Sequence, residues 1–139
     1  MKKYFKNLRD VNRFLNIFYV EFTALYKDVN TVDFILILCI KLFDTKAYEY
    51  ISKNLHTFIR DYNYEVGYSN LDKWRESKTE IIKTLIKNDN TIKVIFEIFP
   101  ALNEYSYEYN NNVKKNQRKI CDVDFSDIYF QLNVPSSTL

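Results

Sequence analysis

The sequence predicts an all-α protein, a compact bundle of about five to seven helices. The 139 residues include one glycine and two prolines, far fewer turn residues than β-sandwiches and barrels require. Hydrophobic residues make up 47% of the chain, which is enough for a real core. We therefore expect one helical domain over residues 1–139, which can divide into sub-lobes 1–66 and 67–139 near Gly67, the only glycine.

The first helix is predicted over residues 5–27. Its apolar side chains recur at spacings of three and four, so they form one stripe along the helix. The stripe comprises Leu8, Val11, Leu15, Phe18, Phe22 and Leu25. We place Arg9, Arg13 and Asn16 on a different face of this helix.

The second helix is predicted to end near Phe43 and to lie at the centre of the bundle, because it is apolar on nearly all sides. Asn30 or Thr31 can cap its start with a side-chain oxygen. Its apolar run, residues 32–43, is too short for a membrane span of about 20 residues. The N-terminus also lacks the apolar region of a signal peptide. We expect a cytoplasmic chain with no transmembrane segment.

Three further helices are expected. One begins at Asp44 or Thr45 and turns inward the side chains of Ala47, Tyr48, Ile51, Leu55, Phe58 and Ile59. The next covers roughly residues 71–87, with a core face of Trp74, Ile81, Ile82, Leu85 and Ile86. A short helix over 91–99 is stopped by Pro100. Residues 103–112 read as a surface loop, 113–120 as a basic turn or strand, and 125–132 as a short helix or strand.

Several chemistries are excluded by residue type. His56 is the only histidine, so neither a zinc site nor a Ser/His/Asp triad can be argued. One glycine cannot build a phosphate-binding loop, and we therefore expect no catalytic residue and no metal in this chain. We interpret the carboxylates as parts of solvated acidic turns. They are Asp122, Asp124 and Asp127, and Glu104 with Glu108.

Arg9 and Arg13 are the candidate site residues. They lie one helical turn apart, and the arginine fork of donors suits phosphate oxygens. Beside a nucleotide, either could sense the γ-phosphate. The alternative, which the spacing alone favours, is that they pair with Asp10, Glu21 or solvent.

A second basic group mixes cations with aromatic residues, as single-strand binders do. It consists of Lys114, Lys115, Arg118 and Lys119, preceded by Tyr105, Tyr107 and Tyr109. The formal net charge is only +2, and acidic residues flank the group. A solvated loop is the better explanation, and we expect no nucleic-acid partner.

Four segments resemble motifs of the KAP family of P-loop NTPases. Residues 7–16 (NLRDVNRFLN) match N-x-R-D-[VIL]-[KN]-R-F-x-N, and residues 29–34 match V-N-x-V-D-[FL]. Residues 41–48 match [KR]-L-F-D-x-x-x-Y, and the final motif is matched by R-K-I-C at 118–121 with Phe125, Tyr129 and Phe130. The resemblance covers about the first 60 and the last 20 residues and is diffuse between them.

The resemblance implies that this chain is the helical lid that follows the nucleotide-binding core, with the Walker motifs upstream. Residues 1–10 already reach the first motif, which favours a fragment. In such lids an arginine can reach the nucleotide, which makes Arg9 the first and Arg13 the second candidate sensor. The parent would be a bacterial ATPase using ATP and Mg²⁺. Some members are linked to phage exclusion, and many carry membrane spans, so the parent could be membrane-associated.

Under this interpretation the chain holds no cofactor, is not an enzyme by itself, and has the missing core as its partner. The alternative is an independent α-helical protein-interaction module. A lid predicts an exposed apolar patch beside Arg9, whereas the module predicts a sealed surface there and a stable oligomer. A third hypothesis, a single-strand binder through residues 105–119, predicts salt-sensitive binding.

Overall fold

The computed structural model describes residues 4–59, 71–102, 117–122 and 124–130. Within these ranges the protein contains six α-helices and no strand, which confirms the predicted all-α bundle. The α-helices are α1 (Leu8–Leu25), α2 (Thr31–Phe43), α3 (Thr45–Lys53), α4 (Leu55–Phe58), α5 (Leu71–Leu85) and α6 (Asp89–Ile98). The 3₁₀ helices η2 and η5 cover Pro100–Leu102 and Ser126–Phe130.

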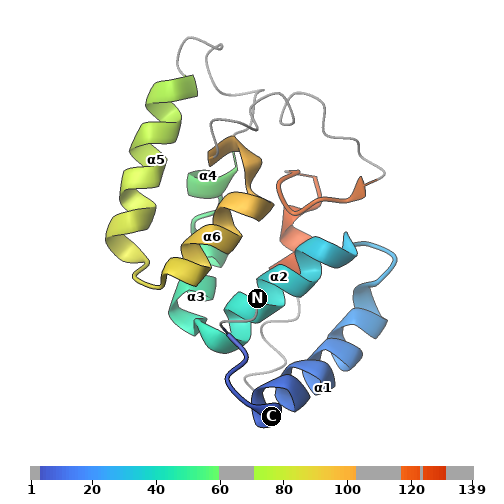
Figure 1. Ribbon diagram of the computed structural model, residues 1–139. Coiled ribbons are helices and arrows are strands. Elements are labelled where there is room, and N and C mark those ends of the chain that lie inside the picture. Colours follow the sequence, from blue (N-terminus) through green and yellow to red (C-terminus); the bar gives the residue numbers. More distant parts are fainter. Residues whose placement is uncertain (1–3, 60–70, 103–116, 123, 131–139) are drawn as a thin grey trace.

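Helix α2 forms the centre of the bundle, as its apolar sequence predicts. Figure 1 shows α1 along one side of α2, with α3 and α6 on the other. The side chains of residues 37–40 are almost completely buried, which is the expected position for a helix that is apolar all round. No helix in the described ranges is long and apolar enough to cross a membrane.

Short polar side chains cap four of the helices. Asn7 accepts a hydrogen bond from a backbone N–H in the first turn of α1, and Asn30, Asp44 and Asn88 do the same for α2, α3 and α6. Each cap satisfies a donor that has no partner within the helix, which is worth about 1 kcal/mol. Of the two candidate caps predicted for the second helix, Asn30 is the one observed, and the third helix begins at Thr45, one of its two predicted starts.

The stripe predicted on α1 is wrong at two positions. Leu8 is 73% exposed and Leu15 is 52% exposed, whereas Phe14, which was left out of the stripe, is buried. The buried side of the helix follows its aromatic residues instead. Phe14 stacks on Phe18 and Phe18 on Phe22, with ring centroids 5.8 and 4.9 Å apart. Rings four residues apart form one continuous ridge, and this ridge buries more apolar area than a row of leucines.

The predicted third and fourth helices also needed correction. The third is interrupted at Asn54, which separates α3 from α4 and whose Nδ2 donates to the carbonyl of Tyr50. In α5, Ile81 and Leu85 are exposed rather than part of the core, whereas Ile82 is completely buried. Helix α5 lies at the edge of the bundle (Figure 1), so only a narrow stripe of its surface meets other elements.

The predicted boundary between sub-lobes, at residues 66 and 67, lies outside the described residues. Contacts nevertheless join residues from its two sides. The Thr91 hydroxyl donates to Asp44 Oδ2 at 2.7 Å, and Tyr4 Oη lies 2.6 Å from the same hydroxyl oxygen. The rings of Phe58 and Phe99 pack with their centroids 5.3 Å apart.

Candidate functional site

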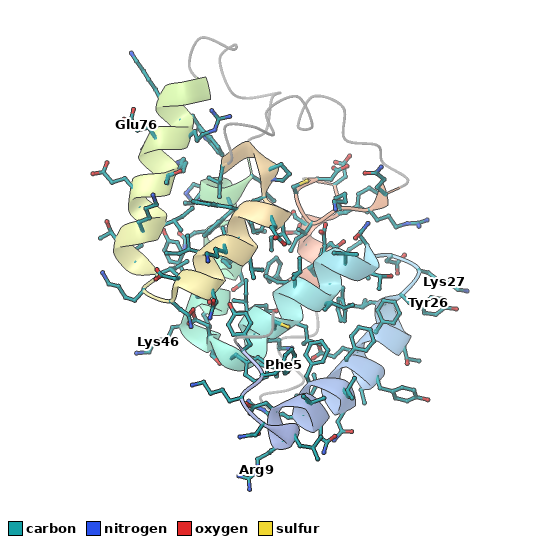
Figure 2. All side chains as sticks on the ribbon, in the orientation of Figure 1. Phe5, Arg9, Tyr26, Lys27, Lys46 and Glu76 are labelled. Atoms are coloured by element: carbon teal, nitrogen blue, oxygen red, sulfur yellow. The ribbon has the colours of Figure 1, made fainter. Side chains whose placement is uncertain are left out.

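Arg9 and Arg13 both lie in the first half of α1, one helical turn apart and exposed to solvent. Figure 2 shows Arg9 projecting from the N-terminal end of α1, away from the rest of the bundle. The Asn7 cap and the aromatic ridge on the opposite side of α1 set this direction. The structure thus places both predicted residues on one accessible surface.

The carboxylates expected to neutralise these arginines bind elsewhere. Asp10 Oδ2 accepts a hydrogen bond of 3.0 Å from the backbone N–H of Lys6. Glu21 Oε1 forms an ion pair of 2.7 Å with Lys41 Nζ. Within the described part of the chain, Arg9 and Arg13 take part in no ion pair. Their guanidinium groups are therefore available to an external anion.

An exposed apolar surface lies beside the arginines. We define the outer face of α1 by its exposed large apolar side chains, Leu8, Leu15, Tyr19, Val20 and Tyr26. Tyr19 is the most exposed of them, at 75%. Single exposed apolar residues are ordinary, but four on one helix with a fifth, Tyr26, at its C-cap form the kind of patch that marks an interaction site.

The ion pair between Glu21 and Lys41 explains why this face is also basic. Both side chains are largely buried, with 13% and 12% of their surface exposed, and Lys41 Nζ lies 5.8 Å from the ring centroid of Tyr48. The pair therefore links α1 to α2 and α3. Because Glu21 is engaged there, the exposed charged residues between positions 6 and 27 are cationic, and the exposed Asp28 follows directly after them. The cationic residues are Lys6, Arg9, Arg13 and Lys27.

A buried polar cluster at the start of α2 was missed by the sequence reasoning. Asp33 is only 2% exposed and accepts hydrogen bonds from the backbone N–H of Ile120 at 2.9 Å and from Lys119 Nζ at 3.2 Å. Burial raises the pKa of the Asp33 carboxyl, and these two donors partly offset that effect. The signal in the sequence was an aspartate inside an otherwise apolar run.

Asn30 and Tyr129 extend this cluster. The backbone N–H of Asn30 donates to the Tyr129 hydroxyl at 2.7 Å, and that hydroxyl donates to the carbonyl of Arg118. Asn30 Nδ2 also donates to the carbonyl of Gln117 at 3.2 Å. Arg118 has a positive φ of 50°, a conformation that costs a non-glycine residue about 1 kcal/mol or more. The hydrogen bond from Tyr129 helps to hold it there.

These contacts bear on the second basic group. Lys119 is ion-paired with Asp33, so it does not contribute an independent cation to a nucleic-acid surface. Lys114, Lys115 and the tyrosines that precede them lie outside the described residues, as do Glu104 and Glu108. The expectation that no nucleic acid binds here remains a prediction.

The remaining candidate groups form local structure. Asp122 Oδ1 accepts from the backbone N–H of Asp124 at 2.9 Å, which closes a turn, but Asp122 is buried rather than solvated as predicted. His56 is exposed, and no group of potential metal ligands occurs among the residues that the structure describes. Cys39 and Cys121 are buried thiols and are not joined in a disulfide. Burial raises the pKa of Cys121 to about 12, which makes its thiol unreactive.

Comparison of the chain with family models, with curated proteins and with solved structures gives no match. The fold establishes an all-α protein, and the outer face of α1 carries two arginines without an ion pair among the described residues. The KAP resemblance stays a prediction that rests on the motifs alone.

Proposed function

We propose that this chain is a helical docking domain whose α1 outer face packs against a partner protein. The observation that supports this is the set of exposed apolar side chains on α1, beside two arginines that have no carboxylate partner among the described residues. Leaving such a patch in water is unfavourable by roughly 25 cal/mol for each Å² of apolar surface. A partner that covers it would recover this free energy.

The partner we propose is the nucleotide-binding core of a KAP-like P-loop NTPase. Arg9 then reaches the γ-phosphate of ATP-Mg²⁺, and Arg13 is the second candidate for that role. The chain by itself does not hydrolyse ATP, and its work is to couple the state of the nucleotide to further partners in the cytoplasm. Support comes from the motif at residues 7–16 together with the exposed, unpaired state of both arginines.

The alternative, an independent protein-interaction module, predicted a sealed surface around Arg9. Leu8, the residue next to Arg9, is instead one of the most exposed apolar side chains in the described part of the chain. This exposure favours a docking domain that works against a separate surface. An interaction module that uses the same outer face without any nucleotide remains the second candidate.

The experiment measures the ATPase rate of the longest product that the gene encodes. A separate assay measures the association of this chain with the proposed nucleotide-binding core. Arg9→Ala is expected to lower the turnover by about 10³-fold while association is retained, since an arginine at the γ-phosphate stabilises the transition state. Leu15→Asp is expected to weaken association, because it places a charge in the apolar contact. Lys83→Ala, on the exposed side of α5, is the control and should change neither.

The outcomes separate the two candidates. If Leu15→Asp weakens association and Arg9→Ala leaves turnover unchanged, the chain is a docking module without a nucleotide-sensing role. If neither substitution has an effect beyond that of Lys83→Ala, the outer face of α1 is not a docking surface and the proposal is wrong.

A further inference from the structure

A pocket lies where the start of α3 meets the turn between α5 and α6, away from the outer face of α1 (Figure 1). Its volume is about 400 Å³, within the range of sites that bind small organic molecules. Four apolar side chains form its walls. They are Phe43, Ala47, Leu85 and Ile86.

The lining of this pocket carries a net positive charge, because it contains two lysines and one aspartate. Lys46 and Lys87 belong to the lining, and both are exposed without an ion pair among the described residues. Figure 2 shows Lys46 extending outward from the bundle. The one carboxylate in the lining, Asp44, is already engaged, because Oδ1 accepts from the backbone N–H of Ala47 at 3.4 Å and Oδ2 accepts from Thr91 at 2.7 Å.

Two further groups in the pocket lack the contacts that their chemistry favours. Leu85 is 54% exposed, although its position in α5 adjoins a wall of other apolar side chains. Tyr50 packs its ring edge-on against Phe58, with centroids 5.9 Å apart, but its hydroxyl has no hydrogen-bond partner among the described residues. Apolar side chains, a tyrosine and two lysines thus line one cavity.

We propose that this pocket binds a small organic anion. The apolar body of the ligand lies against Ala47 and Leu85, and its carboxylate or phosphate interacts with Lys46 and Lys87. The anionic group is required because the two lysines outnumber Asp44 and give the lining a net positive charge. Hydrogen bonds between a cation and an anion are stronger than those between neutral groups. The apolar body is required because most of the wall is hydrocarbon, which an inorganic anion would not cover.

Octanoate is the probe that tests this proposal, because it combines an aliphatic chain with one carboxylate. A titration of the full chain labelled with ¹⁵N is expected to give saturable amide shifts confined to residues 43–50 and 85–88, with a Kd of about 1 mM or lower. Octanol, which lacks the charge, should bind at least about tenfold more weakly. Inorganic phosphate, which lacks the apolar body, should produce no saturable shift.

Substitutions show whether the lysines hold the anion. The double variant Lys46→Ala with Lys87→Ala should raise the octanoate Kd about tenfold. Its matched control is Lys73→Ala with Lys83→Ala, two exposed lysines of α5 that do not line the pocket. Leu85→Asp, at a position exposed enough to leave the fold intact, should abolish binding by placing a carboxylate in the apolar wall.

Several results would overturn the proposal. They are octanoate shifts that do not saturate or that lie outside the two ranges, equal affinity for octanoate and octanol, and equal loss of affinity in the pocket and control variants. A Tm equal to that of the wild type confirms that each variant is folded. Because none of the lining residues belongs to α1, this test is independent of the proposed docking function.

Discussion

The carboxylate of Asp33, in the first turn of α2, accepts a hydrogen bond of 2.9 Å from the backbone N–H of Ile120, 87 residues further along the chain. The neighbouring Lys119 pairs with the other carboxylate oxygen at 3.2 Å. Tyr129 reinforces the attachment by bonding to the Asn30 backbone. One buried acidic side chain thus attaches Lys119 and Ile120 to the central helix.

Asp33→Ala is expected to destabilise the protein by about 2 to 3 kcal/mol, because it leaves the buried N–H of Ile120 without its acceptor and removes the ion pair with Lys119. Asp33→Asn keeps an oxygen acceptor and should cost less. The free energy of unfolding in urea measures both effects. Asp28→Ala, an exposed change in the preceding turn, should stay within about 0.5 kcal/mol of the wild type. Equal effects at the two positions would contradict the buried role of Asp33.

The raised pKa of Asp33 predicts that the stability of the protein depends on pH. Burial raises the pKa of Asp33 above the ordinary value of 3.8, so the folded protein binds this proton more tightly than the unfolded chain does. The resulting stabilisation is fully present below pH 3.8 and is lost as the pH rises through the raised pKa. The stability of the wild type relative to Asp33→Asn should therefore fall as the pH is raised from 3.8 toward neutral. A rise would mean that attraction to Lys119 outweighs burial.

The orientation of α1 can be tested with two neighbouring residues. Phe14→Ala is expected to lower the free energy of unfolding by about 3 kcal/mol, because it removes a buried ring and leaves a cavity. Leu15→Ala should change it by about 0.5 kcal/mol or less, since that side chain is mostly exposed. Chemical denaturation of both variants measures the difference. The reverse order would show that the face predicted from the leucine spacing is the buried one.

The ion pair between Glu21 and Lys41 should contribute more than an ordinary surface pair. Its atoms are 2.7 Å apart and both side chains are largely buried, so solvent screens it weakly. A double-mutant cycle with Glu21→Gln and Lys41→Met is expected to give a coupling of about 1 kcal/mol or more. Lys41→Met should be the costlier single change, because it also removes the cation from the Tyr48 ring. A coupling near zero would show that α1 is held by its aromatic ridge alone.

Helix α2 shows how far sequence reasoning reached. A helix that is apolar on every side has no polar face to expose to solvent, so its central position follows from composition alone. Asn30 was recognisable as a candidate cap because a short polar side chain before a helix satisfies a local donor. The prediction of α1 was correct in type and at Phe18, Phe22 and Leu25, but wrong at Leu8 and Leu15, since leucine and phenylalanine positions both fit a helical spacing. Tertiary packing distinguishes them, because Phe14 packs against the ring of Phe5, which in turn packs against Phe43 of α2.

The same limit applies to the candidate site. Spacing identified Arg9 and Arg13 as neighbours on one helix but could not say whether Asp10 or Glu21 would neutralise them. The structure answers this, because Lys41 comes from another helix to bind Glu21. The pocket beside Lys46 and Lys87 was not predicted at all, since its walls come from two segments about 40 residues apart in the chain.

The sequence by itself determined the all-α class, the position of α2 and the starts of α2, α3 and α5, because these depend on composition and on contacts within a few residues. Tertiary structure alone decided which side of α1 faces the core, and that Asp33 would be buried beneath Ile120. It also decided which charges are left unpaired. Such outcomes depend on residues far apart in the chain that compete for the same buried space and the same partners. The spacing of residues within one helix cannot predict the result of that competition.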